Sequence, residues 1–200
     1  MKTYFKSILL LFLFSINANS QSDWTLAKND QQIQIYTRDV QGSKIKEFKA
    51  TTNVKADINQ ILEMLINFGD YSKWIDGCQS GNLLKKITPN KFIYRITLSL
   101  PWPLKNRDAV IEALISKESN GIVTFTMNEN TSFLKTQEEY IRMPKFRGKW
   151  VLTPKENGFV QVEQQIHAEP GGSIPAWVAN SKVTDGPLAT FINLKKKVVN

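Results

Sequence analysis

The C-terminal segment, residues 170–199, constrains the fold most strongly, because it combines a turn sequence with one long helical pattern. It begins with Pro170-Gly171-Gly172, and apolar residues then recur at helical spacing. The stripe consists of Ile174, Trp177, Val178, Leu188, Phe191, Ile192 and Val199. Pro187 interrupts the stripe and removes a helix hydrogen bond, so residues 185–187 predict either a kink or two helices in series. A helix of this kind must lay its apolar face on another layer.

The layer on which it lies is predicted to be a sheet, because most of the preceding chain alternates apolar and polar residues. About eight short strands are expected, including 33–39, 44–54, 92–100, 108–115, 122–127, 133–142, 146–152 and 159–167. Tight turns separate them, which favours a strongly curved antiparallel sheet.

One helical pair interrupts the strands. Asp57 and Gln60 form a capping-box pattern ahead of an apolar helical stripe, and Gly69 stands where a helix-ending glycine is expected. A short second helix is predicted over 71–75. The order of two strands, a helical pair, about six strands and a long helix predicts an α+β fold in which the sheet wraps around the C-terminal helix.

Small residues at inward positions of the predicted strands suggest a cavity between sheet and helix. These residues are Ala50, Ala109, Ala113 and Gly148. Close packing against Trp and Phe from elsewhere is the alternative, and composition alone does not separate the two.

The first twenty residues are predicted to be an export signal. Lys2 and Lys6 precede an apolar run, residues 8–16, and Ala18-Asn19-Ser20 supplies small residues for cleavage. Residues 21–200 then form one domain in the periplasm or outside the cell. Removal of the two lysines lowers the formal charge from +8 to +6. This basic balance suits anionic membrane surfaces or solubility alone, and no nucleic-acid partner is expected.

Four segments of the chain carry a resemblance to a known family. They are Phe68-Gly69-Asp70-Tyr71-Ser72-Lys73-Trp74, Leu100-Pro101-Trp102-Pro103 with Asn106-Arg107-Asp108, Arg147-Gly148-Lys149-Trp150-Val151-Leu152, and Pro170-Gly171-Gly172-Ser173-Ile174-Pro175-Ala176-Trp177. In this order and spacing the chain resembles the START (StAR-related lipid transfer) domain of the helix-grip, or Bet v 1-like, group. The resemblance implies a curved antiparallel sheet gripping a long C-terminal helix, with a hydrophobic tunnel that holds one lipid.

The resemblance also directs attention to Arg107. The Arg107-Asp108 pair matches the family's Arg-Asp at the start of a strand, and in sterol-binding members that Arg meets an acid one strand earlier. Here residues 79–82 contain no acid, and Asp76 is the nearest one. Arg107 is therefore a candidate headgroup ligand, with an internal salt bridge as the alternative.

The predicted ligand contacts are cavity-lining residues, with core packing as the alternative for the tryptophans. The candidates are Arg107, Trp74, Tyr94, Ile111, Trp150, His167, Trp177 and Phe191. Trp102, between two prolines, is the candidate for membrane contact. The Pro170-Gly171-Gly172 turn and residues 185–187 are the expected hinge and bend of a lid.

Catalytic patterns are absent from the sequence. The only histidine, His167, and the only cysteine, Cys78, have no motif that pairs them, and no cluster has metal-ligand spacing. No enzyme activity, metal or cofactor is expected. The predicted function is binding of a lipid or another hydrophobic small molecule by a monomer, with transfer of the lipid between membranes as an extension of that function. Two alternatives are a polyketide cyclase or aromatase using His167 or Arg107, and a basic protein-interaction module.

Overall fold

The computed structural model describes residues 23–199, so the predicted export signal lies outside the described residues. In the described chain one sheet has the order β1-β2-β3-β10-β9-β7-β6-β5-β4, and β8 is added alongside β6. Neighbouring strands are antiparallel except β6 and β8, which are parallel. The strands are β1 (Thr25–Asp30), β2 (Ile33–Arg38), β3 (Glu47–Lys55), β4 (Cys78–Thr88), β5 (Lys91–Leu98), β6 (Asn106–Lys117), β7 (Val123–Glu129), β8 (Tyr140–Arg142), β9 (Lys145–Pro154) and β10 (Phe159–Glu169).

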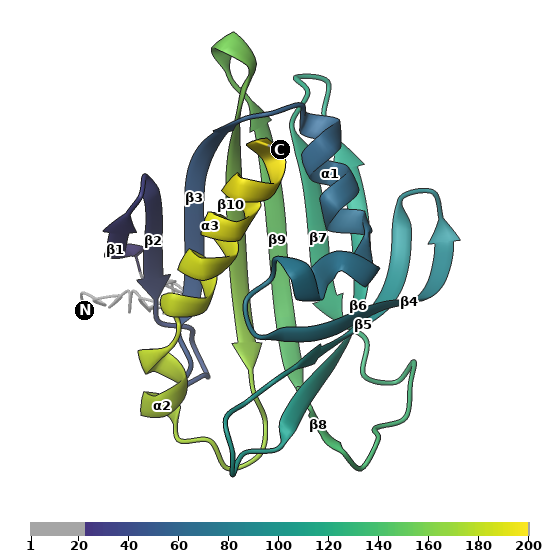
Figure 1. Ribbon diagram of the computed structural model, residues 1–200. Helices are drawn as coiled ribbons and strands as arrows, with labels where there is room; N and C mark the ends of the chain where they lie inside the picture. The colour runs from purple at the N-terminus through teal and green to yellow at the C-terminus, as the bar shows by residue number, and fades with distance from the viewer. Residues whose placement is uncertain (1–22, 200) are drawn as a thin grey trace, which may run out of the picture.

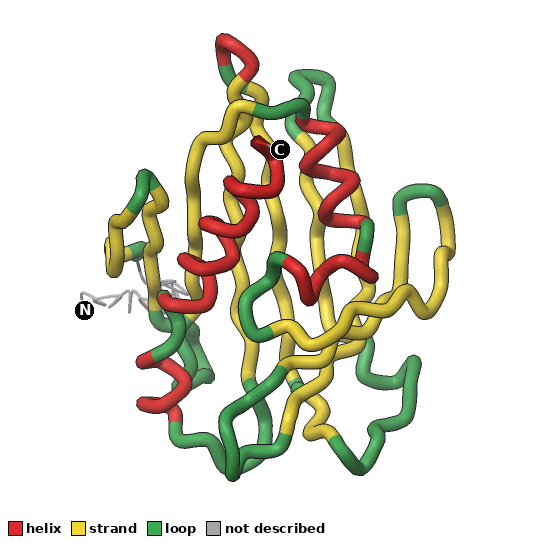
Figure 2. The backbone as a smooth tube through the Cα atoms, in the orientation of Figure 1, coloured by secondary structure: helices red, strands yellow, loops and turns green. Residues whose placement is uncertain are grey.

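One face of this sheet carries α1 (Ile58–Ile66), the 3₁₀ helix η1 (Phe68–Lys73), α2 (Ala176–Ser181) and α3 (Asp185–Val199). The 3₁₀ helix η2 (Glu156–Gly158) forms the turn between β9 and β10 instead. Figure 1 shows α3 and α1 side by side across the sheet, with α2 below the lower end of α3. The curved strands lie behind these helices in Figure 2, and loops gather at the two ends of the molecule. The predicted α+β helix-grip architecture is confirmed.

The core lies between the sheet and the helices, as the alternation of the strands requires. On β5, Phe92, Tyr94 and Ile96 are buried on the helix-facing side. On α3, Phe191 and Leu194 are completely buried, and α3 packs against β3 and β2. No helix in the described part of the chain is long and apolar enough to cross a membrane.

The C-terminal segment forms two helices in series rather than one kinked helix. Pro187 lies in the first turn of α3, where its missing N–H removes no helix hydrogen bond. The break falls at residues 182–184, slightly before the predicted position. The stripe predicted for the first part was wrong, because no residue of α2 is buried and Trp177 is 75% exposed.

The predicted strand over residues 133–142 was also wrong. Only Tyr140–Arg142 pair, as β8, and the preceding residues form a loop. Phe133, the main apolar residue of the pattern, is exposed, and Lys135 and Glu138 are exposed with it. Apolar alternation predicts a strand only where one face is buried, and here neither face is.

Gly69 does not end α1, contrary to the prediction. The helix ends at Ile66 with Asn67 as its cap, and Gly69 lies within η1 without a positive φ. The start of α1 agrees with the sequence, since the Asp57 side chain accepts a hydrogen bond from the Asn59 N–H at 2.6 Å.

Gly81, rather than Gly69, is the glycine that the helix-to-sheet contact requires. A Cβ at position 81 would lie 2.2 Å from the Phe68 carbonyl oxygen, whereas one at position 69 meets nothing closer than 3.8 Å. We expect Gly81→Ala to lower the free energy of unfolding by about 1–3 kcal/mol, because η1 must move away from β4. Gly69→Ala is the matched control and should be neutral or slightly stabilising. Urea unfolding of both variants measures the difference, and equal stabilities would contradict the close contact.

Candidate binding cavity

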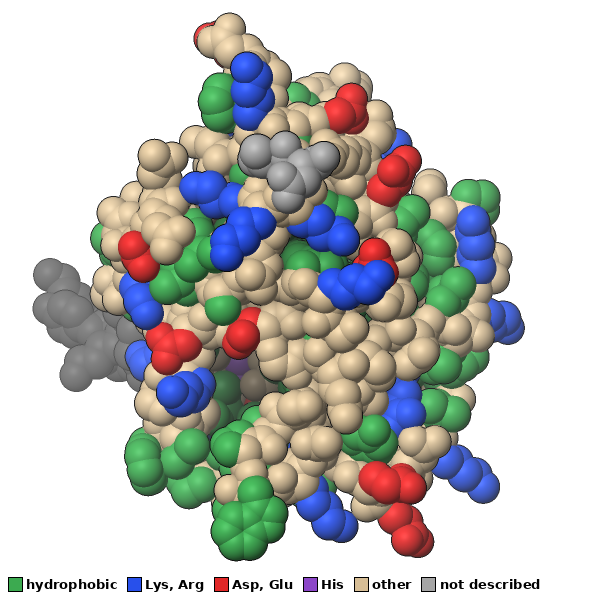
Figure 3. All heavy atoms as spheres, in the orientation of Figure 1, with side chains coloured by type: hydrophobic (Ala, Val, Ile, Leu, Met, Phe, Trp, Pro, Cys, Tyr) green, Lys and Arg blue, Asp and Glu red, His purple; other side chains and the backbone are tan. Residues whose placement is uncertain are grey.

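A cavity of about 210 Å³ lies between the helix-facing side of the sheet and the first turns of α3. Strands β3, β5, β7, β9 and β10 form its floor, η1 and the segment after it form one side, and α3 closes the top. The apolar wall includes Phe48, Tyr94, Ile96, Leu98, Met127, Met143, Phe146, Trp150, Ile166 and Ala168. Figure 3 shows the surface hollowed on this face, to the left of centre.

Packing explains why the space lies at this end of α3. Toward the middle of the helix, Phe191 stacks on Trp150 with ring centroids 5.6 Å apart, and Trp74 lies 5.8 Å beyond Trp150. These rings fill the gap between helix and sheet. At the first turns of α3, Gly186 and Thr190 face Ala168 across the cavity, and small side chains leave the gap open. The small residues proposed from sequence, such as Ala50 and Ala113, are packed in the core instead.

A second hollow adjoins the cavity beneath α2. It also has a volume of about 210 Å³ and shares Phe48, Ile166, Ala168 and Pro187 with the cavity wall. Its other sides come from the β2–β3 loop and from α2 and the residues that follow it. The cavity therefore continues toward the surface under α2.

Helix α2 is attached to the protein mainly through polar contacts. The Asn180 side chain accepts from the Lys46 N–H at 2.9 Å and donates to the Lys44 carbonyl at 2.9 Å. Because α2 buries no side chain, few apolar contacts oppose its displacement.

Arg107 does not line the cavity, and it forms no salt bridge with Asp108. Its guanidinium is buried and donates to the carbonyl oxygens of Lys105, Pro170 and Gly171. Burial lowers the pKa of Arg107 from its usual value. The side chain thus fixes the Pro170-Gly171-Gly172 turn, the predicted hinge of the lid, and both glycines there have positive φ.

Asp108 binds two other arginines. Its carboxylate is fully buried and accepts from Arg95 Nε at 2.8 Å and from Arg142 Nε and Nη2 at 2.8 and 2.9 Å. Arg142 also donates to the Leu134 carbonyl, which attaches the loop before β8. Burial raises the pKa of Asp108, but hydrogen bonds and positive charge from Arg142 and Arg95 outweigh it and hold the pKa below its usual value.

The structure brings two of the sequence-derived candidates, Tyr94 and Trp150, to the cavity wall. Trp74, Ile111 and Phe191 are buried in the core without lining the cavity.

His167, Trp177 and Trp102 lie elsewhere. His167 stands between two lining residues of β10 and so belongs to the opposite face of the strand, where its Nε2 is 3.2 Å from Ser43 Oγ. Burial, with a contribution from Arg147, lowers the pKa of His167. Trp177 and Trp102 are 75% and 93% exposed.

The polar groups of the cavity wall are mostly neutral and already hydrogen bonded. Tyr71 donates to the Leu65 carbonyl at 2.6 Å, and the Tyr94 hydroxyl lies 3.2 Å from Met127 Sδ. Burial raises the pKa of Tyr71 and of Tyr94 well above the usual range, and raises the pKa of the Cys78 thiol to about 11. The described residues include no group of His, Cys, Asp and Glu placed to hold a metal.

Sequence reasoning missed Gln164, which lines the cavity from β10. The sequence signal for Gln164 was its place in the alternation: it is the polar residue that comes after Val160 and Val162 on the buried face of the strand. Asp76 also lines the cavity, at its exposed side.

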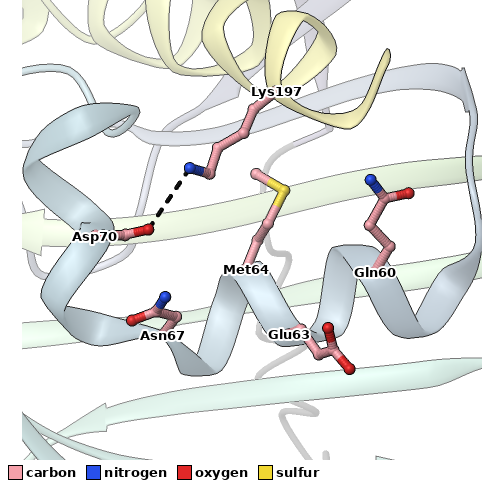
Figure 4. A pocket seen from close by; sticks show the side chains of 6 residues that line it. All are labelled: Gln60, Glu63, Met64, Asn67, Asp70 and Lys197. Carbon is pink, nitrogen blue, oxygen red and sulfur yellow. Dashed lines mark ion pairs between the residues drawn. The ribbon is translucent and has the colours of Figure 1, made fainter. Parts of the chain in front are cut away.

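A separate hollow between α1 and α3 differs in character. Its volume is about 300 Å³, and Figure 4 shows Gln60, Glu63, Met64, Asn67, Asp70 and Lys197 around it. Lys197 Nζ lies 3.6 Å from Asp70 Oδ2, so this ion pair joins the C-terminal end of α3 to η1. The side chains here are mainly polar, and the hollow offers little apolar surface to a lipid.

Comparison with known proteins gives consistent results. The START domain family model matches residues 12–198 of this chain. An uncharacterized protein of Pseudomonas aeruginosa is 35% identical over 190 residues, which cover 94% of each chain. The crystal structure of a STAR-related lipid transfer protein from Xanthomonas axonopodis superposes with a TM-score of 0.83 at 32% identity, covering 88% of this chain and 99% of that one. Human StAR-related lipid transfer protein 5 shares the fold, with a TM-score of 0.81 at 14% identity over 90% of this chain and 88% of that one.

Proposed function

Because the chain belongs to the START domain family, we propose that it binds a lipid or another hydrophobic small molecule in the cavity between the curved sheet and α3. The observation that carries the proposal is the apolar wall of this cavity, which continues under the weakly attached α2. No reaction is proposed at His167, since it is not among the residues that line the cavity and its Nε2 contacts Ser43 Oγ.

Hydrophobic burial supplies free energy of the same size as the cost of association. Each buried methylene contributes about 0.8 kcal/mol, so ten of them give about 8 kcal/mol. The loss of translational and rotational freedom on association opposes this by about 4–15 kcal/mol. The cavity of about 210 Å³ is smaller than the roughly 300–1,000 Å³ of most ligand pockets. We therefore propose that α2 moves outward and joins the two hollows when a ligand enters.

The proposal is tested with N-phenyl-1-naphthylamine, an uncharged apolar dye that fluoresces in apolar surroundings. We expect saturable fluorescence with one dye per chain, and displacement of the dye by lipids extracted from the host cells. No saturable fluorescence, together with no displacement or uptake of any lipid, would contradict the proposed function.

We also propose that the protein is exported and contacts a membrane surface through Trp102. This side chain is 93% exposed in the β5–β6 loop, at the same end of the molecule as α2 (Figure 1). Aromatic rings of this kind are favoured at the headgroup level of a bilayer.

Replacing Trp102 with Ser should weaken binding to anionic phospholipid vesicles by at least about fivefold, because burial of a large apolar side chain contributes more than 1 kcal/mol. Unfolding stability should not change, since the side chain is exposed. Vesicle sedimentation measures the effect. Phe159→Ser, at the other end of the sheet and 40% exposed, is the control. Equal sedimentation of the two variants would exclude Trp102 as the contact.

A further inference from the structure

We propose that the ligand carries an uncharged hydrogen-bonding group, a hydroxyl or an amide, which binds to the side-chain amide of Gln164. This inference rests on the proposed function and specifies the class of lipid that the cavity accepts. Its basis is one buried polar side chain without a protein partner, together with the distribution of charge around the cavity.

The Gln164 side chain is largely buried, has no hydrogen-bond partner among the described residues, and keeps its polar atoms accessible from the cavity. It lies on β10 opposite Trp150 of β9 and Ala50 of β3, lines the cavity, and is only 5% exposed. No group in the described chain hydrogen-bonds to its side chain, although its sequence neighbour Gln165 donates to Glu47 at 3.0 Å. Burying an amide without a partner is unfavourable. A ligand that supplies the missing hydrogen bonds therefore gains affinity at this position.

No other neutral side chain of the wall offers both an amide donor and a carbonyl acceptor, although the Trp150 indole N–H and the Thr190 hydroxyl can still donate to a ligand. The groups of Tyr71, Tyr94 and Cys78 already contact Leu65, Met127 and Ser80, respectively. Thr190 Oγ1 accepts from the Asp76 N–H at 3.0 Å. Gln164 thus keeps both an amide donor and a carbonyl acceptor for the ligand, which suits a hydroxyl or an amide.

The charges around the cavity disfavour an anionic headgroup. No Lys or Arg of the described chain lines the cavity, and its one charged lining residue is Asp76, a carboxylate. In the adjoining hollow, Lys46 is paired with Asp39 at 2.9 Å and Lys182 with Asp185 at 3.7 Å. An anion inside the cavity would lose hydration without gaining a cation, which strongly disfavours binding.

The test compares 1-decanol with sodium decanoate as displacers of N-phenyl-1-naphthylamine, because the two share a ten-carbon chain and differ in headgroup charge. Wild-type protein should bind decanol at least about tenfold more tightly than decanoate. Gln164→Met, which keeps the side-chain length but removes the amide, should weaken decanol binding about five- to tenfold, as expected for loss of a buried hydrogen bond. Gln161→Met is the control, because Gln161 lies on the opposite face of the same strand.

Thermal unfolding of the ligand-free variants gives a second, independent measurement. Gln164→Met should unfold at the same or a higher temperature than wild type, because it removes an unpartnered buried amide. Unchanged decanol affinity in this variant, or equal binding of decanoate and decanol, would overturn the inference while leaving lipid binding intact. A variant that unfolds at lower temperature would assign Gln164 a structural role instead. No displacement by either compound and no dye binding would overturn the proposed function as well.

Discussion

Replacing Asp108 with Asn should lower the free energy of unfolding by about 3–5 kcal/mol, which is the cost of breaking a buried ion pair from one side. The carboxylate is fully buried between Arg95 and Arg142, whose side chains are 12% and 9% exposed. Asn preserves the shape but leaves two buried guanidinium groups without a counter-charge. Urea unfolding at neutral pH measures the loss.

A matched control lies on the same strand. Glu112 pairs with Lys91 at 2.8 Å, but both side chains are 35% exposed. Glu112→Gln should change stability by less than about 1 kcal/mol, as for other solvent-accessible pairs. Similar losses in the two variants would contradict the structural importance of the Asp108 network.

The effect of Asp108→Asn should depend on pH. The folded state holds the pKa of Asp108 below its usual value, so the carboxylate contributes stability above the unfolded pKa of about 3.9. That contribution is lost as the pH falls through the folded pKa. The difference between wild type and variant should therefore be constant near neutrality and decrease below about pH 4. A difference that grows in acid would show that another group dominates.

Ala168→Phe should abolish ligand binding without unfolding the protein. Ala168 lines both hollows, so a phenyl ring here occupies the cavity and its continuation under α2. We expect affinity for N-phenyl-1-naphthylamine to fall at least about a hundredfold. The free energy of unfolding should change by less than the roughly 1–3 kcal/mol that overpacking a filled core costs, because the ring enters open space. Gln161→Phe, on the opposite face of β10, is the control and should bind the dye normally. Normal binding by Ala168→Phe would place the ligand elsewhere.

Alternation and turn chemistry predicted most of the sheet, and the exceptions have physical causes. Strands β1 and β4 were missed because both are mostly exposed, and β4, with Lys85 and Lys86 in its second half, lacks one apolar face. The strand predicted over 133–142 was wrong because tertiary contacts leave Phe133 exposed. Local sequence does not report whether a segment lies at the edge of a sheet or in a loop outside it, and these errors come from that missing information.

The candidate site was less predictable than the fold. The position of Tyr94 on the cavity side of its strand was predictable from the alternation of apolar and polar residues alone. Trp177 followed a helical pattern that continues through α2, although α2 buries none of its residues. The partners of Arg107, the carbonyls of Pro170 and Gly171, lie more than sixty positions away and offer no side-chain pattern to detect. Gln164 was detectable in principle, since a polar residue at a buried position of a strand indicates either a partner or a ligand.

Native mass spectrometry of the protein purified from its own host tests the central claim, lipid binding in the cavity, most directly. We predict a non-covalent adduct of one lipid-sized molecule per chain in the wild type, and its absence from Ala168→Phe prepared in the same way. An uncharged lipid with a hydroxyl or amide would also agree with the role of Gln164. The bare mass of the chain in every preparation, with no dye or lipid taken up by the purified protein, would contradict the account.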